Sequence, residues 1–177
     1  MLTVLLGGAR SGKSALAIEV AARGGDIVTY VATSPAIEGD NDLAVRIARH
    51  RAERPSNWVT IEEELDLVGA VAQVGTRVVI IDCLTVWAGN MLHHGHEERA
   101  MLDVSDAAIR AISDRDLNVV VVSNEVGLGI VPVNELAREY RDVLGRVNQR
   151  WVAAADHALF MAAGRALPLR DPWELLR

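Results

Sequence analysis

A glycine-rich segment near the start of the chain has the composition and spacing of a phosphate-binding loop. Residues 7–14 read Gly-Gly-Ala-Arg-Ser-Gly-Lys-Ser, which matches G-x-x-x-x-G-K-[ST]. Glycines let the backbone curl so that several N–H groups point at one anion, and the start of a following helix adds positive potential. The apolar run 2–6 predicts a buried strand before the loop, and residues 14–22 predict a helix after it. We therefore expect the chain to bind a nucleoside triphosphate.

Two side chains of this loop have expected roles. Lys13 should reach the β- and γ-phosphates, and the hydroxyl of Ser14 should hold Mg²⁺. A glycine-rich turn arising by chance is disfavoured because strand, loop and helix follow one another in the required order. The nucleotide-binding residues that the motif predicts are Gly7, Gly8, Ala9, Arg10, Ser11, Gly12, Lys13 and Ser14.

Asp82 is the second candidate for phosphate chemistry. It ends the apolar run 77–82, whose Val-Val-Ile-Ile core predicts a buried strand. The carboxyl ends of parallel strands open onto one crevice, so Asp82 is expected to face the phosphate loop and to help hold Mg²⁺, directly or through water. The alternative is an aspartate that only begins a turn after the strand.

His50 is the candidate nucleophile. Four arginines, at positions 46, 49, 51 and 54, surround it within nine residues. Arginine suits phosphate because its planar fork donates two hydrogen bonds at once, and nearby positive charge keeps an imidazole neutral and nucleophilic. The alternative is a histidine on a solvated basic helix face.

Apolar runs alternate with helical patterns along the whole chain. This alternation predicts an α/β fold, a RecA-like P-loop NTPase whose mostly parallel sheet has helices on both faces, in a single domain over residues 1–177. Strands are expected at 2–6, 26–32, 58–61, 77–82, 118–123 and 157–162, with 167–169 pairing beside the last. Helices are expected at 14–22, after a cap at Asn41 or Asp42, and at 64–74, 85–92, 98–113 and 134–154.

Composition limits the class of protein. Half of the 177 residues are apolar, enough to bury the core of one domain. The net charge of −6 argues against general nucleic-acid binding, and no apolar run approaches the roughly 20 residues of a membrane-spanning helix. Cys83 is the only cysteine, which excludes an internal disulfide, and the phosphate loop occupies the place of a signal peptide. We therefore expect a cytoplasmic protein.

Several ordered motifs give the chain a resemblance to a known family. They run from residue 1 to about residue 165. The motifs are the loop 7–14, Tyr30-Val31-Ala32-Thr33-Ser34, Arg46-Ile47-x-x-His50-x-x-x-Arg54-Pro55-x-x-Trp58-x-Thr60-x-Glu62, Asp82-Cys83-Leu84-Thr85, Ser123-Asn124-Glu125-Val126-Gly127-Leu128-Gly129-Ile130-Val131-Pro132 and Arg141-Asp142-x-x-Gly145-Arg146-Val147-Asn148-Gln149. In these motifs the chain resembles the bifunctional adenosylcobinamide kinase/adenosylcobinamide-phosphate guanylyltransferase of cobalamin biosynthesis.

The resemblance implies two reactions in one protein. In the first, the γ-phosphoryl group of ATP or GTP passes to the aminopropanol hydroxyl of adenosylcobinamide. In the second, a histidine matching His50 attacks the α-phosphate of GTP, and adenosylcobinamide phosphate then takes the GMP group to give adenosylcobinamide-GDP. Splitting the transfer through a phosphoramidate keeps the nucleotidyl group activated. By resemblance, His50 and Lys13 are the catalytic residues.

The resemblance also implies further nucleotide contacts and partners. Mg²⁺ would be held by Ser14 and Asp82, and homo-oligomers, commonly trimers, would form. Glu62 would contact guanine, with a solvated surface glutamate as the alternative. The further nucleotide-binding residues carried over are Ala32, Thr33, Ser34, Arg51, Ala52, Glu53, Arg54, Glu62 and Asp82.

Other assignments stay open on sequence alone. The residues also suit a P-loop small-molecule kinase without nucleotidyl transfer, or a regulatory nucleotide-binding module. Corrinoid contacts could come from Trp87, Trp151 or the segment 124–132. The cluster at 93–98, with three histidines and two acids, invites a metal hypothesis, but a solvated loop explains it as well. The apolar tail 171–177 could pack on the body or on a neighbouring subunit.

Overall fold

Seven strands form one sheet in the computed structural model, which describes residues 1–34, 45, 48 and 51–176. Their order is β3-β2-β4-β5-β1-β6-β7, and each neighbouring pair is parallel except β6 with β7. The strands are β1 (Leu2–Gly7), β2 (Val28–Ala32), β3 (Val59–Glu62), β4 (Val78–Asp82), β5 (Asn118–Val122), β6 (His157–Ala162) and β7 (Arg165–Pro168).

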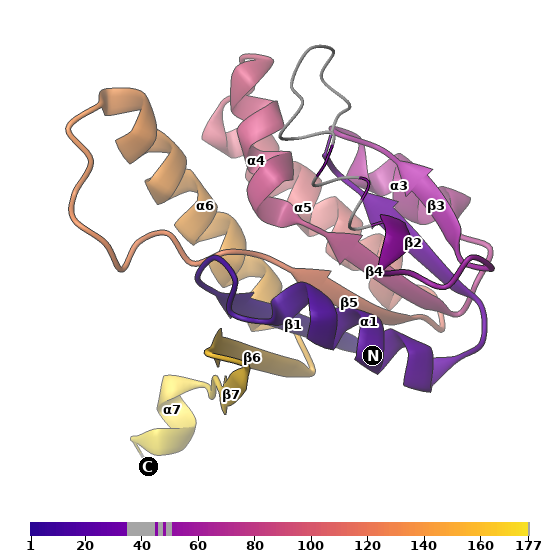
Figure 1. Ribbon diagram of the computed structural model, residues 1–177. Coiled ribbons are helices and arrows are strands. Elements are labelled where there is room, and N and C mark those ends of the chain that lie inside the picture. Colours follow the sequence, from indigo (N-terminus) through magenta and orange to yellow (C-terminus); the bar gives the residue numbers. More distant parts are fainter. Residues whose placement is uncertain (35–44, 46–47, 49–50, 177) are drawn as a thin grey trace.

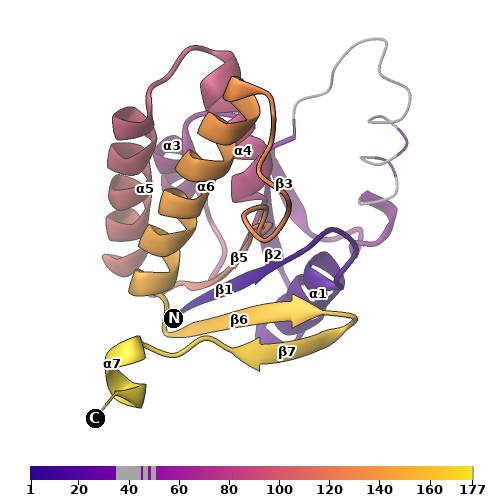
Figure 2. The same ribbon diagram turned by 90° about the vertical axis from the view of Figure 1, so that its left-hand side faces the viewer.

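Helices pack on both faces of this sheet, as the sequence predicts (Figures 1 and 2). The described helices are α1 (Lys13–Gly24), α3 (Leu67–Gln73), α4 (Leu84–His93), α5 (Glu98–Ser113), α6 (Glu135–Ala154) and α7 (Pro172–Leu175). Figure 2 shows α1 on one side of the sheet and α3 to α6 on the other, with α7 set apart near the C-terminus.

Alternating side chains of the strands divide the core between the two faces. Val79 and Ile81 of β4 pack with the layer of α3 to α6, whereas Val78 and Ile80 pack toward α1. Successive strand residues point to opposite faces, so an all-apolar strand is buried on both sides. The uninterrupted Val/Ile runs in the sequence are therefore explained by a sheet covered on both faces.

Most element boundaries match the sequence prediction, and one helix is shorter than predicted. The predicted helix 64–74 begins only at Leu67, because the Glu63 carboxylate accepts hydrogen bonds from the N–H groups of Leu65 and Asp66, 2.9 Å each. The Asp66 side chain then caps the helix by accepting from the N–H of Gly69. Asn41 and Asp42, the caps expected for a further helix, lie outside the described residues.

The strand order brings the two phosphate-chemistry motifs to one edge with a single strand between them. β5 lies between β1, which carries the phosphate loop, and β4, which ends at Asp82. Val122 of β5 pairs with Leu5 on one side and with Asp82 on the other. At about 4.8 Å per strand, β1 and β4 are about 10 Å apart at this edge. This order agrees with the predicted RecA-like P-loop fold.

None of the helices in the described part of the chain has both the length and the apolar character needed to cross a membrane.

The first glycine of the phosphate loop is constrained by the neighbouring strand β6. Gly7 has φ 146°, and a Cβ atom there would lie 2.2 Å from the carbonyl oxygen of Met161. Gly145, within α6, has no atom within 4 Å of such a Cβ. The two glycines therefore differ in whether a methyl group can be accommodated.

We predict opposite effects on stability for Gly7→Ala and Gly145→Ala. Gly7→Ala should lower the free energy of unfolding by about 3 kcal/mol or more, since backbone must move and φ becomes strained. Gly145→Ala should raise it by about 0.4–1 kcal/mol, because alanine costs less conformational entropy in a helix. Urea denaturation of both variants checks this, and a Gly7→Ala protein as stable as the parent would contradict the close approach to Met161.

Candidate functional site

The phosphate loop is closed by its own lysine. The Lys13 ammonium donates to the carbonyl of Gly8 at 2.7 Å and to Oγ of Ser11 at 3.2 Å. Arg10 and Gly12 have positive φ values of 56° and 98°, which turn the loop backbone around the lysine head group. A concave loop with a buried cation at its centre is suited to bind phosphate oxygens.

Burial and charge act in opposite directions on this lysine. Only 6% of Lys13 is exposed, and this burial lowers the pKa of its ammonium group, while the nearby Asp82 raises it. Ser14, the next residue, is half-buried on the first turn of α1. The positive group and the hydroxyl expected from the sequence thus lie at the start of one helix.

Asp82 is held by a buried tyrosine. The hydroxyl of Tyr30, on β2, donates to Oδ2 of Asp82 at 2.5 Å. Burial raises the pKa of Tyr30 far above its ordinary value, and the charge of Asp82 raises it further. The phenol therefore remains a hydrogen-bond donor at any physiological pH. This contact orients the carboxylate at the end of β4.

One residue of the segment after position 50, Arg54, contacts the same tyrosine. The Arg54 guanidinium lies over the ring of Tyr30, 3.7 Å from its centroid, and donates to Oγ1 of Thr60 at 3.2 Å. Arg51 forms an ion pair with Glu62. A cation above an aromatic face is attracted by the ring's negative face. A line of contacts therefore runs from Arg54 through Tyr30 to Asp82.

His50 lies outside the described residues, and so do Arg46 and Arg49. Arg54 stacks on the ring of Tyr30, and the hydroxyl of Tyr30 donates to Asp82. It sets Glu62 at the end of β3, four strands from β1 in the sheet. Four strand spacings amount to about 19 Å. Glu62 and its partner Arg51 thus lie at the opposite side of the site from the phosphate loop.

Thr33 links the loop after β2 to the loop after β4. Its hydroxyl donates to the carbonyl of Cys83 and accepts from the N–H of Cys83, both at 2.8 Å. The side-chain amide of Asn90, on α4, donates to the carbonyl of Thr33 at 2.8 Å. Burial raises the pKa of the Cys83 thiol to about 12, which leaves it protonated. Thr33 is therefore held beside Asp82.

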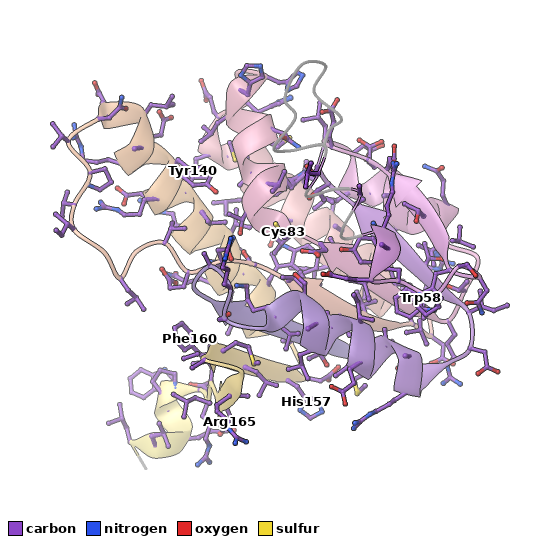
Figure 3. All side chains as sticks on the ribbon, in the orientation of Figure 1. Trp58, Cys83, Tyr140, His157, Phe160 and Arg165 are labelled. Atoms are coloured by element: carbon purple, nitrogen blue, oxygen red, sulfur yellow. The ribbon has the colours of Figure 1, made fainter. Side chains whose placement is uncertain are left out.

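A network of polar side chains holds the end of β5, and it was not predicted from the sequence. Asn148 of α6 accepts from Oγ of Ser123 at 2.7 Å and donates to the carbonyl of Asn124 at 3.1 Å. The N–H of Asn124 donates to Oγ1 of Thr85 at 2.6 Å, and the Tyr140 hydroxyl donates to the carbonyl of Thr85 at 3.0 Å. Figure 3 shows Tyr140 on the side of α6 toward α4. The motifs at 123–132 and 141–149 contain Ser123, Asn124 and Asn148, so they were the signal from which this network could have been predicted.

Two corrinoid candidates from the sequence are wrong. Trp87 and Trp151 are fully buried in the core beneath α4 and α6, where no substrate can reach them. Both tryptophans instead pack in the core, as apolar residues on a helix commonly do. The segment 124–132 differs, since Leu128 and Ile130 are 78% and 98% exposed.

Two further sequence features lie away from this site. Residues 93–97 are exposed, and the described part of the chain contains no group of three or more His, Cys, Asp or Glu residues arranged to hold a metal ion. In the C-terminal tail, Trp173 and Leu176 are 71% and 73% exposed, so they do not pack on the body of the chain.

The residues expected to hold Mg²⁺ have suitable chemistry. Ser14 offers a hydroxyl and Asp82 a carboxylate, both hard oxygen donors. Mg²⁺ in nucleotide sites is commonly bound by one or two protein oxygens together with substrate phosphates and water. One edge of the sheet therefore carries groups that can bind a triphosphate with its cation: the phosphate loop, Asp82 and the segment after β2 that contains Thr33.

Comparisons with known proteins agree in one family. The model of a family described as cobinamide kinase / cobinamide phosphate guanyltransferase matches residues 3–169. The bifunctional adenosylcobalamin biosynthesis protein CobP of Pseudomonas aeruginosa is 41% identical over 174 residues, which cover 96% of this chain and 98% of that protein. The corresponding protein CobU of Salmonella typhimurium is 36% identical over 184 residues, covering 96% of this chain and all of that protein.

Solved structures that resemble this one are more distant in sequence. A KaiC-like protein from Pyrococcus horikoshii has a TM-score of 0.54 at 12% identity, covering 90% of this chain and 69% of that one. An ATPase of the type III secretion system of pathogenic bacteria has a TM-score of 0.53 at 12% identity, covering 94% and 56%. These likenesses support the P-loop NTPase fold.

We predict that Tyr30→Phe destabilises the protein through the loss of one charged hydrogen bond. The ring stays packed, so the free energy of unfolding should fall by about 1.5–3 kcal/mol, the usual range for a bond to an ionised group. Tyr140→Phe is the matched control, because its hydroxyl bonds a neutral carbonyl and should cost only about 1 kcal/mol. Urea denaturation measures both; an unchanged Tyr30→Phe midpoint would show that the bond to Asp82 contributes nothing.

Proposed function

The chain belongs to the cobinamide kinase / cobinamide phosphate guanylyltransferase family, and on that basis we propose how its residues divide the two activities. It is an enzyme of cobalamin biosynthesis that acts as a kinase and as a guanylyltransferase. These two activities argue against both a kinase without nucleotidyl transfer and a purely regulatory module.

In the kinase reaction, the loop 7–14 holds the β- and γ-phosphates of ATP or GTP. Backbone N–H groups and Lys13 neutralise the charge that spreads over the γ-phosphoryl oxygens during transfer. The acceptor is the aminopropanol hydroxyl of adenosylcobinamide. Its oxygen bonds to the γ-phosphorus as the bond to the β-phosphate oxygen breaks, and the nucleoside diphosphate leaves.

In the guanylyltransferase reaction, a ring nitrogen of His50 attacks the α-phosphorus of GTP and pyrophosphate leaves. The same loop and Lys13 then retain the leaving group. A phosphate oxygen of adenosylcobinamide phosphate next attacks the guanylyl-histidine, the P–N bond breaks, and adenosylcobinamide-GDP forms. Each step exchanges one bond to phosphorus for another, so no further reagent is required.

The observation that carries this proposal is the line of contacts from Arg54 through Tyr30 to Asp82. It ties the segment that follows His50 to the acid at the end of β4. Positions 50 and 54 are four residue steps apart, and that length of chain spans at most about 14 Å. Arg51 and Arg54 bring positive charge to the β2 and β3 side of the site, across from the phosphate loop.

We further propose that Ser14 and Asp82 hold Mg²⁺ with the nucleotide. When bound, the cation would neutralise charge on the β- and γ-phosphates. The protein side of this site is rigid: Ser14 lies on the first turn of α1, and the Tyr30 hydroxyl orients Asp82. Glu62 is proposed to accept from guanine N–H groups, and Ala32, Thr33 and Ser34 to line the nucleotide.

The proposed partners are GTP, ATP, adenosylcobinamide and its phosphate, with further copies of the same chain. A homo-oligomer, a trimer by family resemblance, is supported by exposed apolar side chains in the β5–α6 loop and the tail, such as Ile130 and Trp173. Use of both nucleotides favours the cytoplasm as the site of action, within one catalytic domain over residues 1–177.

We predict that GTP labelled at the α-phosphate leaves label on the protein when Mg²⁺ is present. A phosphoramidate survives alkali and is lost in acid, and His50→Ala should abolish the label because the nucleophile is gone. The label is measured on denatured, washed protein after acid and alkali treatment.

His94→Ala is the matched control, since His94 is exposed at the end of α4 and should leave the label unchanged. If the His50→Ala protein retained the label, the nucleophile would have to be another residue. Wild-type protein without label would refute the guanylyl-histidine route.

A further inference from the structure

The kinase reaction must remove a proton from an alcohol, and none of the residues assigned to it so far does so. Lys13 is a cation proposed to bind phosphate, and Asp82 accepts from Tyr30 and is proposed to hold Mg²⁺. Nucleotidyl transfer has no such need, because the attacking oxygen of a phosphate is already ionised. The two reactions therefore differ in one requirement, a carboxylate or other base beside the γ-phosphate.

Few carboxylates lie near the phosphate loop in the described sheet. β1 has β5 and β6 as neighbours, and β6 is followed by Ala163 and Gly164. β5 is followed, three residues beyond its end, by Glu125. The acids at 62–64 lie at and just beyond the end of β3, about 19 Å away across four strand spacings. Glu125 thus follows the strand that lies between β1, which carries the phosphate loop, and β4, which ends at Asp82.

The backbone that carries Glu125 is anchored on three sides. The N–H of Ser123 donates to the carbonyl of Leu5 at 2.9 Å, and that of Asn124 to Oγ1 of Thr85 at 2.6 Å. The N–H of Glu125 itself donates to the carbonyl of Gly7, the first residue of the phosphate loop, at 3.2 Å. Successive residues are therefore fixed to β1, to α4 and to the phosphate loop.

The side chain of Glu125 is also oriented. Its Oε1 accepts from the N–H of Gly127 at 2.6 Å. A Cβ atom at Gly127 would lie 2.9 Å from this oxygen, so glycine permits the close approach. Glu125 is half-buried, and the chain beyond it runs outward with exposed apolar residues such as Leu128 and Ile130 (Figure 1). A large amphipathic acceptor can lie against that segment with its hydroxyl toward the phosphate loop.

We propose that Glu125 is the general base of the kinase reaction. This inference rests on the proposed function. A carboxylate oxygen of Glu125 takes the proton of the acceptor hydroxyl as the alcohol oxygen bonds to the γ-phosphorus. The bond from the γ-phosphorus to the β-phosphate oxygen breaks, the nucleoside diphosphate leaves with the electron pair, and the protonated carboxyl group afterwards returns its proton to water.

The test separates the two half-reactions in Glu125→Gln. Glutamine keeps an Oε1 that can accept from Gly127, so the loop conformation should persist, but an amide is no base. The kinase kcat with adenosylcobinamide should fall about 10²–10⁴-fold, the range for loss of a general base, while the KM for the corrinoid changes by less than about threefold. Protein labelling by α-labelled GTP, and GMP transfer to adenosylcobinamide phosphate, should stay within about twofold of wild type.

Glu139→Gln, an exposed glutamate on α6, is the matched control and should leave both activities unchanged. An unchanged kinase rate in Glu125→Gln would overturn the inference. So would an equal loss of both activities, because it would assign Glu125 to loop structure. Absence of either activity in the wild-type protein would instead count against the proposed function.

Discussion

The parallel pairing of β5 with both β1 and β4 is the constraint on which the rest of the site depends. It sets the phosphate loop, the end of β5 and Asp82 along one edge, in a fixed order and at fixed spacing. The strands carry no polar catalytic group in their interiors. The residues proposed for the chemistry lie where the chain leaves this edge, with Lys13 and Ser14 at the start of α1 and Asp82 at the end of β4.

Polar side chains at this edge are satisfied in ways that also orient them. Asn148 uses both of its amide atoms on the segment after β5, and Tyr30 uses its hydroxyl on Asp82. A buried polar group without a partner is costly, so each of these bonds favours one arrangement of its loop. The rigidity needed for catalysis therefore comes from the same contacts that allow polar groups to be buried.

The proposed use of one triphosphate site for two reactions requires different groups to approach the α-phosphate and the γ-phosphate. The phosphate loop, next to β1 and Glu125, is proposed to bind the γ-phosphate end. Arg54 and Tyr30 lie on the β2 and β4 side. This separation is consistent with one nucleotide, bound once, reacting at its α- or γ-phosphorus according to which group attacks.

Local patterns in the sequence were sufficient for the elements and for the motif residues. Uninterrupted Val/Ile runs predicted strands buried on both faces. The motif at 7–14 predicted a loop between a strand and a helix. Both signals depend only on neighbouring residues. The same reasoning failed for Trp87 and Trp151. An aromatic residue on an apolar helix has the same local pattern whether it contacts a ligand or the core.

The sequence by itself determined the fold class, the phosphate loop and the family. Only the tertiary structure decided that Tyr30 orients Asp82, that Arg54 stacks on Tyr30, and that Asn148 and Thr85 fix the segment leading to Glu125. These contacts join residues that are 24 to 52 positions apart. The order of strands in the sheet brings them together, and that order results from packing of the whole chain rather than from any local pattern.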